Sequence, residues 1–146
     1  MRRLKICLFS ALLVLLAAWP SGAASGSDYI LLGNEAADME NYDQALAYYN
    51  QAINSSGLKA ENRAIAYHNR GCVHYDLGRE DEAFNDFTQA IALDPKYDPP
   101  YYHRSFIYEQ RGDYERALAD MQKAVSLDSS FAEYHDRLEW LNDQRP

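Results

Sequence analysis

The sequence predicts an all-α solenoid of helical hairpins, and three observations support this prediction. A tyrosine, a small residue four positions later and two alanines seven residues apart recur three times. These residues are Tyr29, Gly33, Ala45 and Ala52; Tyr67, Gly71, Ala83 and Ala90; and Tyr101, Ser105, Ala117 and Ala124. The last two copies are 34 residues apart, and the first two are separated by four residues more. Because apolar residues within each copy also follow helical spacing, the pattern indicates stacked helical units.

A short break divides each copy into two predicted helices. The breaks are Met39-Glu40-Asn41, Leu77-Gly78-Arg79 and Arg111-Gly112-Asp113. Glycine is favoured just after a helix C-terminus, and Asn41 and Asp113 are suitable N-caps for the next helix. Arg79 is a poorer cap. Each pair of helices is expected to form an antiparallel hairpin, with the recurring small residues where the two backbones approach.

Two segments extend this plan. Residues 59–63 contain the four-residue excess and are expected to add a turn to the start of the second copy's first helix, the alternative being a longer loop. Residues 131–146 are expected to form one more helix with a narrow apolar stripe at Tyr134, Leu138 and Leu141. A solenoid needs such a capping helix to cover its last repeat with a polar outer face.

The second copy carries five residues of the tetratricopeptide repeat (TPR) pattern: Tyr67, Gly71, Ala83, Phe87 and Pro95. Arg70 and His74 stand where that pattern usually has leucine and tyrosine. The chain therefore resembles the TPR family over roughly residues 26–130, which implies three repeats at about 26–59, 64–97 and 98–131. The resemblance says little about function, because TPR arrays bind many unrelated partners.

Residues 1–24 have the order of a secretory signal peptide. A basic start with Arg2, Arg3 and Lys5 precedes an uncharged run from Ile6 to Trp19, and small residues follow as far as Ala24. The run is short for a membrane span, which needs about 20 apolar residues. We therefore predict cleavage near Ala24 and export to a bacterial periplasm or the cell exterior. An uncleaved N-terminal anchor is the alternative.

Charge and cysteine content restrict the partners of the mature chain. Cleavage would remove three of the 14 basic residues and none of the 22 acidic ones, changing the formal net charge from −8 to −11. Such a charge opposes binding to nucleic acid or to anionic membrane surfaces. Only Cys72 would remain, which excludes an intrachain disulfide and leaves a buried thiol, a free thiol or a disulfide-linked homodimer.

The first helices of TPR arrays line a concave groove, so the resemblance implies one here. The predicted groove residues lie opposite the small-residue seam by helical spacing and are Ile30, Asn34, Asp38, His68, Cys72, Tyr75, Asp76, Tyr102, Phe106 and Glu109. Such a groove is aromatic in its middle and acidic along one rim, which suits a protein or peptide ligand with basic and apolar residues. The alternative is that the aromatic residues only pack against neighbouring helices.

One known groove chemistry can be tested on the sequence. Co-chaperone TPR domains hold a C-terminal carboxylate with two asparagines and three basic residues. The corresponding positions here are Ile30, Asn34, Asn69, Pro99 and His103. Only the asparagines match, and without the cations a buried carboxylate would be uncompensated, so this clamp is not expected.

His68, Cys72 and Asp76 share one helical face, with His103 across the groove. Such a set could hold a metal or activate a thiolate. However, zinc sites usually show paired, closely spaced ligands, and no nucleophile elbow or phosphate-binding loop is present. We therefore predict no catalytic residue, metal or cofactor, and a metal or redox site at His68 and Cys72 is the alternative.

Together these observations predict a non-catalytic protein–protein interaction module, an adaptor in the cell envelope. The rival interpretation is a structural array that associates with itself.

Overall fold

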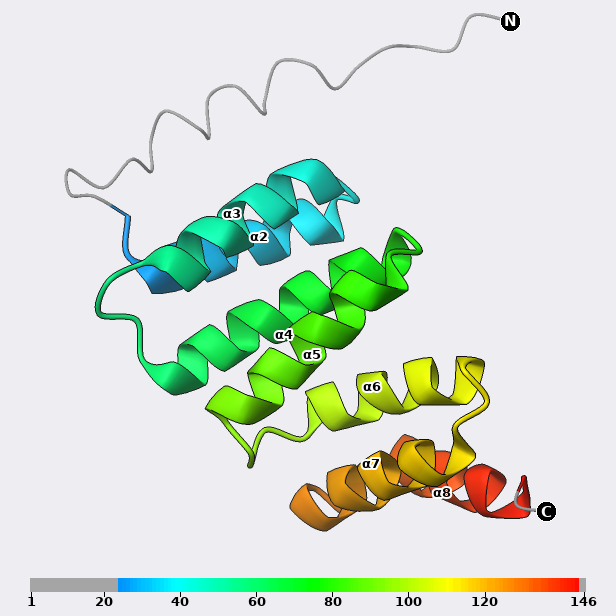
Figure 1. Cartoon of the computed structure of the whole chain (residues 1–146). Coiled ribbons are helices and arrows are strands. Elements are labelled where there is room, and N and C mark those ends of the chain that lie inside the picture. Colours follow the sequence, from blue (N-terminus) through cyan, green and yellow to red (C-terminus); the bar gives the residue numbers. More distant parts are fainter. Residues whose placement is uncertain (1–23, 145–146) are drawn as a thin grey trace, which may run out of the picture.

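The computed structural model describes residues 24–144, which contain seven α-helices and no strand. In chain order the helices are α2 (Gly26–Asp38), α3 (Tyr42–Asn54), α4 (Ala60–Asp76), α5 (Glu80–Leu93), α6 (Pro99–Gln110), α7 (Tyr114–Leu127) and α8 (Ala132–Asp143). They form three antiparallel hairpins, α2/α3, α4/α5 and α6/α7, stacked from the N-terminal to the C-terminal end, with α8 against α7 (Figure 1). The prediction of an all-α solenoid of helical hairpins with a capping helix is confirmed.

The turn inside each hairpin has the same backbone form. The second residue after the first helix adopts a positive φ, 57° at Glu40, 70° at Gly78 and 73° at Gly112. Glycine reaches this region without a steric cost from a Cβ atom, which explains two of the three residues. The caps differ from the prediction at one place. Asp113 accepts a hydrogen bond from the backbone N–H of Arg116, whereas the side chain of Asn41 bonds to Gln44 instead.

The predicted small-residue seam lies where the helices of each hairpin meet. Ala45, Ala83 and Ala117 are all fully buried. A Cβ atom added to Gly33 would lie 2.4 Å from the ring of Tyr49, and one added to Gly71 would lie 2.7 Å from the ring of Phe87. These aromatic rings fill the space that the glycines leave, so larger residues at the seam would overpack it.

The two additional segments are helical. Helix α4 begins at Ala60, so most of the inserted residues form an extra helical turn. The loop between α3 and α4 is therefore as long as the loop between α5 and α6. Helix α8 buries Tyr134 and Leu141 in a cluster with Leu118 and Met121 of α7, and Leu138 packs beside them. This contact covers the last hairpin.

The N-terminal prediction falls mainly outside the described part of the chain. The predicted signal peptide, residues 1–24, lies outside the described residues except for Ala24. Within residues 24–144, no helix is both long enough and apolar enough to cross a bilayer.

Candidate binding groove

The first helices of the three hairpins, α2, α4 and α6, line two adjoining hollows that share Cys72 and Asp76. The hollow between the first two hairpins has a volume of about 280 Å³, and we call it the polar hollow. It is lined by Asn34, Ala37, Asp38, Tyr42, Tyr49, Asn69, Cys72, Val73 and Asp76. The second, of about 690 Å³, is called the aromatic hollow. It is lined by Cys72, Tyr75, Asp76, Pro99, Tyr102, His103, Phe106, Phe131, Glu133 and Tyr134.

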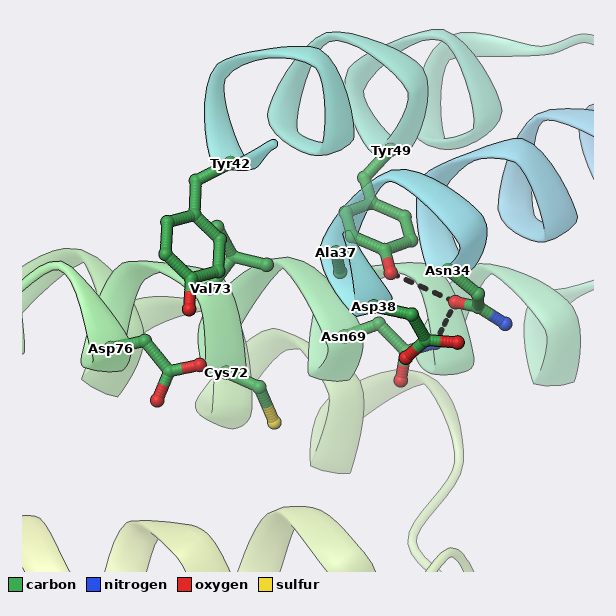
Figure 2. A pocket seen from close by; sticks show the side chains of 9 residues that line it. All are labelled: Asn34, Ala37, Asp38, Tyr42, Tyr49, Asn69, Cys72, Val73 and Asp76. Atoms are coloured by element: carbon green, nitrogen blue, oxygen red, sulfur yellow. Dashed lines mark hydrogen bonds between the residues drawn. The ribbon is translucent and has the colours of Figure 1, made fainter. Parts of the chain in front are cut away.

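A hydrogen-bond network organises the polar hollow. The Oδ1 atom of Asn34 accepts bonds from the hydroxyl of Tyr49 and the Nδ2 of Asn69, both at 2.8 Å. Figure 2 shows Tyr49 entering from α3, Asn34 from α2 and Asn69 from α4, so that three helices meet at one oxygen. Burial raises the pKa of Tyr49 to about 12, so its hydroxyl stays protonated and remains a donor. The exposed carboxylates of Asp38 and Asp76 complete the hollow.

Stacked rings and the capping helix build the aromatic hollow. The ring of Tyr102 packs edge-on against Phe106, with centroids 4.9 Å apart. Its centroid lies 4.8 Å from that of Tyr134 of α8, and these two ring planes are tilted by 30°. The Tyr102 hydroxyl donates a hydrogen bond to Glu133, which also belongs to α8. The guanidinium of Arg137 lies 4.5 Å from the Phe106 ring centroid. The aromatic residues therefore line the hollow and pack against neighbouring helices at the same time.

The structure brings most predicted groove residues together. Asn34, Asp38, Cys72, Tyr75, Asp76, Tyr102 and Phe106 all line one or both hollows. Three others are placed differently. Ile30 is buried in a core cluster with Ala52 and Ala66, because the N-terminal half of α2 packs directly onto α4. His68 is only 8 % exposed and lies below the groove surface. Glu109 is paired with Arg137 of α8, so its charge is neutralised at that rim.

Sequence reasoning missed the groove residues that lie outside the first helices. Tyr42 and Tyr49 reach the polar hollow from α3, and Phe131, Glu133 and Tyr134 reach the aromatic hollow from the start of the cap. Tyr49 gave a usable signal, since it stands where the repeat pattern has phenylalanine and a buried tyrosine hydroxyl needs a partner. The residues at the start of the capping helix gave no such signal, because the repeat pattern in the sequence ends before them.

The environment of Cys72 does not favour an activated thiolate. Burial raises the pKa of its thiol to about 12, and the carboxylate of Asp76 acts in the same direction. The pKa of His68 is lowered to about 3, mainly by burial, so this ring is neutral and supplies no positive charge to the thiol. A thiolate nucleophile needs the opposite setting, a nearby cation and a lowered pKa.

Two buried ion pairs that the sequence reasoning did not identify brace the second and third hairpins. Arg70 binds both carboxylate oxygens of Asp86, at 2.8 and 2.6 Å, and Arg104 binds Asp120 in the same way at 2.7 and 2.9 Å. The third guanidinium nitrogen of each arginine reaches back to the preceding hairpin. Its acceptors there are Asn50 for Arg70 and Thr88 for Arg104. The signal was available, because both arginines and both aspartates are 34 residues apart.

Comparison with known proteins identifies the repeat. Two family profiles, both described as tetratricopeptide repeat, match residues 29–96 and 99–131. Together they span most of the chain. The chain belongs to the tetratricopeptide repeat family. TPR domains are typically interaction modules rather than enzymes.

Curated relatives contain a similar TPR segment within much longer proteins. Human DnaJ homolog subfamily C member 7 is 33 % identical over 82 residues, which are 56 % of this chain and 17 % of that protein. Human serine/threonine-protein phosphatase 5 is 38 % identical over 69 residues, 45 % of this chain and 12 % of the phosphatase. The chain thus spans less than a fifth of either relative.

Solved TPR structures share the fold over most of the chain. The TPR domain of Arabidopsis OM64 superposes with a TM-score of 0.72 at 24 % identity, covering 82 % of this chain and 96 % of that one. The first TPR of Spaghetti (RPAP3), solved with the HSP90 peptide SRMEEVD, also gives 0.72, at 20 % identity and with coverages of 82 % and 97 %. MamA gives 0.69 at 19 % identity, with coverages of 81 % and 67 %.

The residues of the TPR carboxylate clamp are largely replaced in this structure. Asn34 and Asn69 are present, but they are hydrogen-bonded to each other, with Nδ2 of Asn69 donating to Oδ1 of Asn34. By the family resemblance, Ile30, Pro99 and His103 hold the positions of the clamp's cations. Ile30 is buried in the core, and Pro99 and His103 line the aromatic hollow. Burial lowers the pKa of His103, which keeps this ring neutral. The lining residues of the two hollows include no lysine or arginine.

Proposed function

We propose that this chain binds a protein or peptide that places a basic side chain in the polar hollow and an apolar one in the aromatic hollow. The observation that carries the proposal is the division of the groove into these two ends, joined at Asp76. Exposed carboxylates at Asp38 and Asp76 attract a cation, and the rings of Tyr102 and Phe106 offer apolar surface. The module itself is non-catalytic in this proposal.

The charge of the groove distinguishes it from a binder of acidic tails. The Spaghetti TPR was solved with the peptide SRMEEVD, which carries three acidic residues and a single arginine. Here the acidic pair Asp38 and Asp76 stands in the groove, and the cations of the carboxylate clamp are replaced by Ile30, Pro99 and His103. A strongly acidic tail would meet like charge, so a basic ligand is favoured.

The proposed setting is the cell envelope. The order of residues 1–24 supports export with cleavage near Ala24, and the module would then act as an adaptor in a periplasm or outside the cell. Self-association is the competing proposal, and the half-buried position of Cys72 in the floor of the groove makes an interchain disulfide a weak basis for it.

A peptide library panned against the purified protein tests the ligand chemistry. We expect enriched peptides to contain lysine or arginine near an aromatic or large aliphatic residue. For such a peptide, the double variant Asp38→Asn/Asp76→Asn should weaken binding about fivefold, which corresponds to roughly 1 kcal/mol. Fluorescence anisotropy measures this change, and higher salt should reduce the affinity of the unaltered protein.

A matched control separates the groove from the overall charge. The variant Asp43→Asn/Glu115→Gln removes the same two charges from exposed positions at the starts of α3 and α7. Its affinity should equal that of the unaltered protein. Equal weakening in both double variants, or enrichment of acidic peptides, would refute the proposed ligand chemistry.

A further inference from the structure

Three side chains with metal-binding atoms meet between the second and third hairpins. His68 and Cys72 lie one turn apart on α4, and His103 faces them from α6. One donor atom from each residue lies within 4.8 Å of the donor atoms of the other two. The cluster combines ligands from two repeats. Sequence spacing alone does not indicate such a site, because the two histidines are 35 residues apart.

The separations between the donor atoms agree with those of tetrahedral zinc ligands. Zinc–nitrogen bonds of about 2.0–2.1 Å and zinc–sulfur bonds of about 2.3 Å place two nitrogens about 3.3 Å apart and nitrogen and sulfur about 3.6 Å apart. In the structure, Nε2 of His68 lies 3.1 Å from Nδ1 of His103 and 3.6 Å from Sγ of Cys72. Two edges of the ligand triangle therefore already have the lengths that zinc requires, within about 0.2 Å.

Hydrogen bonds on the far side of His68 orient its ring. Asn69 gives an Nδ2 hydrogen to Asn34, so its Oδ1 atom faces Nδ1 of His68 at 3.0 Å and is placed to accept a hydrogen bond from it. The Tyr97 hydroxyl lies 3.2 Å from the same ring nitrogen, and its oxygen can share that hydrogen. With the hydrogen on Nδ1, the Nε2 lone pair points toward Cys72 and His103. Metal-bound histidines commonly hold their other ring nitrogen in this way, with a partner that fixes the tautomer.

The remaining side of the cluster opens to the groove. Cys72 and His103 both line the aromatic hollow, whereas His68 lies behind them. Asp76, one turn beyond Cys72, lines the same hollow. A cation can therefore reach the cluster from the groove, and its fourth coordination position can take water or a side chain from that direction.

We propose that His68, Cys72 and His103 form a zinc site in the floor of the groove. Zinc suits a mixed set of imidazole and thiolate ligands. Binding releases the thiol proton of Cys72 to solvent, and Nδ1 of His103 exchanges its 3.0 Å contact with the carbonyl of Pro99 for the metal. The metal would join α4 to α6 and so fix the angle between the second and third hairpins.

Cobalt titration of the reduced full-length protein tests the site. A Cys7→Ser background leaves Cys72 as the only thiol. We expect one Co²⁺ per chain, with thiolate-to-cobalt absorption and visible bands of a tetrahedral site, both lost when Zn²⁺ is added. The Cys72→Ser and His103→Gln variants should each lose at least about tenfold in affinity. The matched control is His135→Gln, an exposed histidine on α8.

A second measurement covers variants that fail to fold. Circular dichroism checks each variant, and X-ray absorption of the zinc-loaded Cys7→Ser protein reports the ligands without altering them. One sulfur and two imidazole nitrogens around zinc would support the site. A shell of oxygen and nitrogen alone, cobalt spectra that survive Cys72→Ser, or equal loss of binding in His135→Gln would overturn it.

Discussion

The first hairpin and the two that follow share one backbone pattern but are braced differently. Arg70 pairs with Asp86 in the second hairpin, and the same pair recurs 34 residues later in the third. The equivalent positions of the first hairpin are Leu32 and Tyr48, and the ring of Tyr48 stacks on Tyr29 instead. The small-residue seam is common to all three hairpins. The seam thus suffices for the hairpin geometry, whereas the polar brace is optional.

The hairpins also differ at the ring that fills the seam. Tyr49 of the first hairpin corresponds to Phe87 and Met121 in the next two, and all three side chains are almost fully buried. Only tyrosine carries a hydroxyl, which extends into the polar hollow and bonds to Asn34. A core position therefore contributes to groove chemistry in one repeat and not in the others.

The largest expected effect comes from breaking an ion pair in the second or third hairpin. Asp86→Ala leaves Arg70, a largely buried cation, without its carboxylate, and should lower the free energy of unfolding by about 3 kcal/mol. Asp81→Ala is the control, because that carboxylate is 90 % exposed and its pairing with Arg111 is worth less than about 1 kcal/mol. Urea unfolding followed by circular dichroism measures both variants.

Copying the first hairpin into the second sharpens this comparison. The double variant Arg70→Leu/Asp86→Tyr removes both charges together, so no unpaired charge remains buried. Its stability should be closer to that of the unaltered protein than the stability of Asp86→Ala. A double variant as unstable as the single one would show that the ion pair is required for the second hairpin.

A smaller loss is expected when the first hairpin is made to resemble the second at the seam. Tyr49→Phe removes the hydroxyl that bonds to Asn34 and should cost about 0.5–1.5 kcal/mol of unfolding free energy. Tyr48→Phe removes only an exposed bond from Gln44, so its stability should change by less than about 0.5 kcal/mol. Thermal melts compare the two variants. A lower melting temperature for Tyr48→Phe than for Tyr49→Phe would contradict the assigned role of the Tyr49 hydroxyl.

The smallest expected effect concerns the turn of the first hairpin and has the opposite sign. Glu40 has a φ of 57° where the other turns have glycine. Glu40→Gly should therefore raise the free energy of unfolding by about 0.5–1 kcal/mol, because the left-handed conformation costs a non-glycine residue about that much. The reverse change, Gly78→Glu, should lower stability. A decrease in melting temperature for Glu40→Gly would contradict the argument.

The fold was predictable because it depends on residues that repeat. The period and the small residues at Gly33, Gly71 and Ala83 located the hairpins, and the apolar stripe of residues 131–146 located the cap. Cap chemistry was less predictable. Asn41 and Asp113 have equivalent positions, yet only Asp113 bonds to the helix backbone, since Gln44 competes for the Asn41 side chain.

The candidate site was only partly predictable, because its chemistry depends on contacts between repeats. Helical spacing placed Asn34, Cys72 and Phe106 in the groove. It could not show that Ile30 packs into the core, or that Arg137 of the cap neutralises Glu109. Those outcomes depend on how closely adjacent helices approach, which no periodicity within a single helix reports.

The two arginines also give the array a direction. The positions equivalent to Arg70 and Arg104 are Leu32 at the N-terminal side and Leu138 in the cap. Each arginine donates a hydrogen bond to the hairpin that precedes it. Leu32 lies in the first hairpin that the structure describes, and its side chain has no hydrogen-bond donor. Leu138 instead packs into the apolar cluster of the last hairpin. A copy of the second repeat inserted in the middle of the array would bring both an arginine donor and a threonine acceptor, so the hydrogen bonds between hairpins would continue. A repeat added at either end would face a leucine in place of the arginine, and this hydrogen bond would not form there.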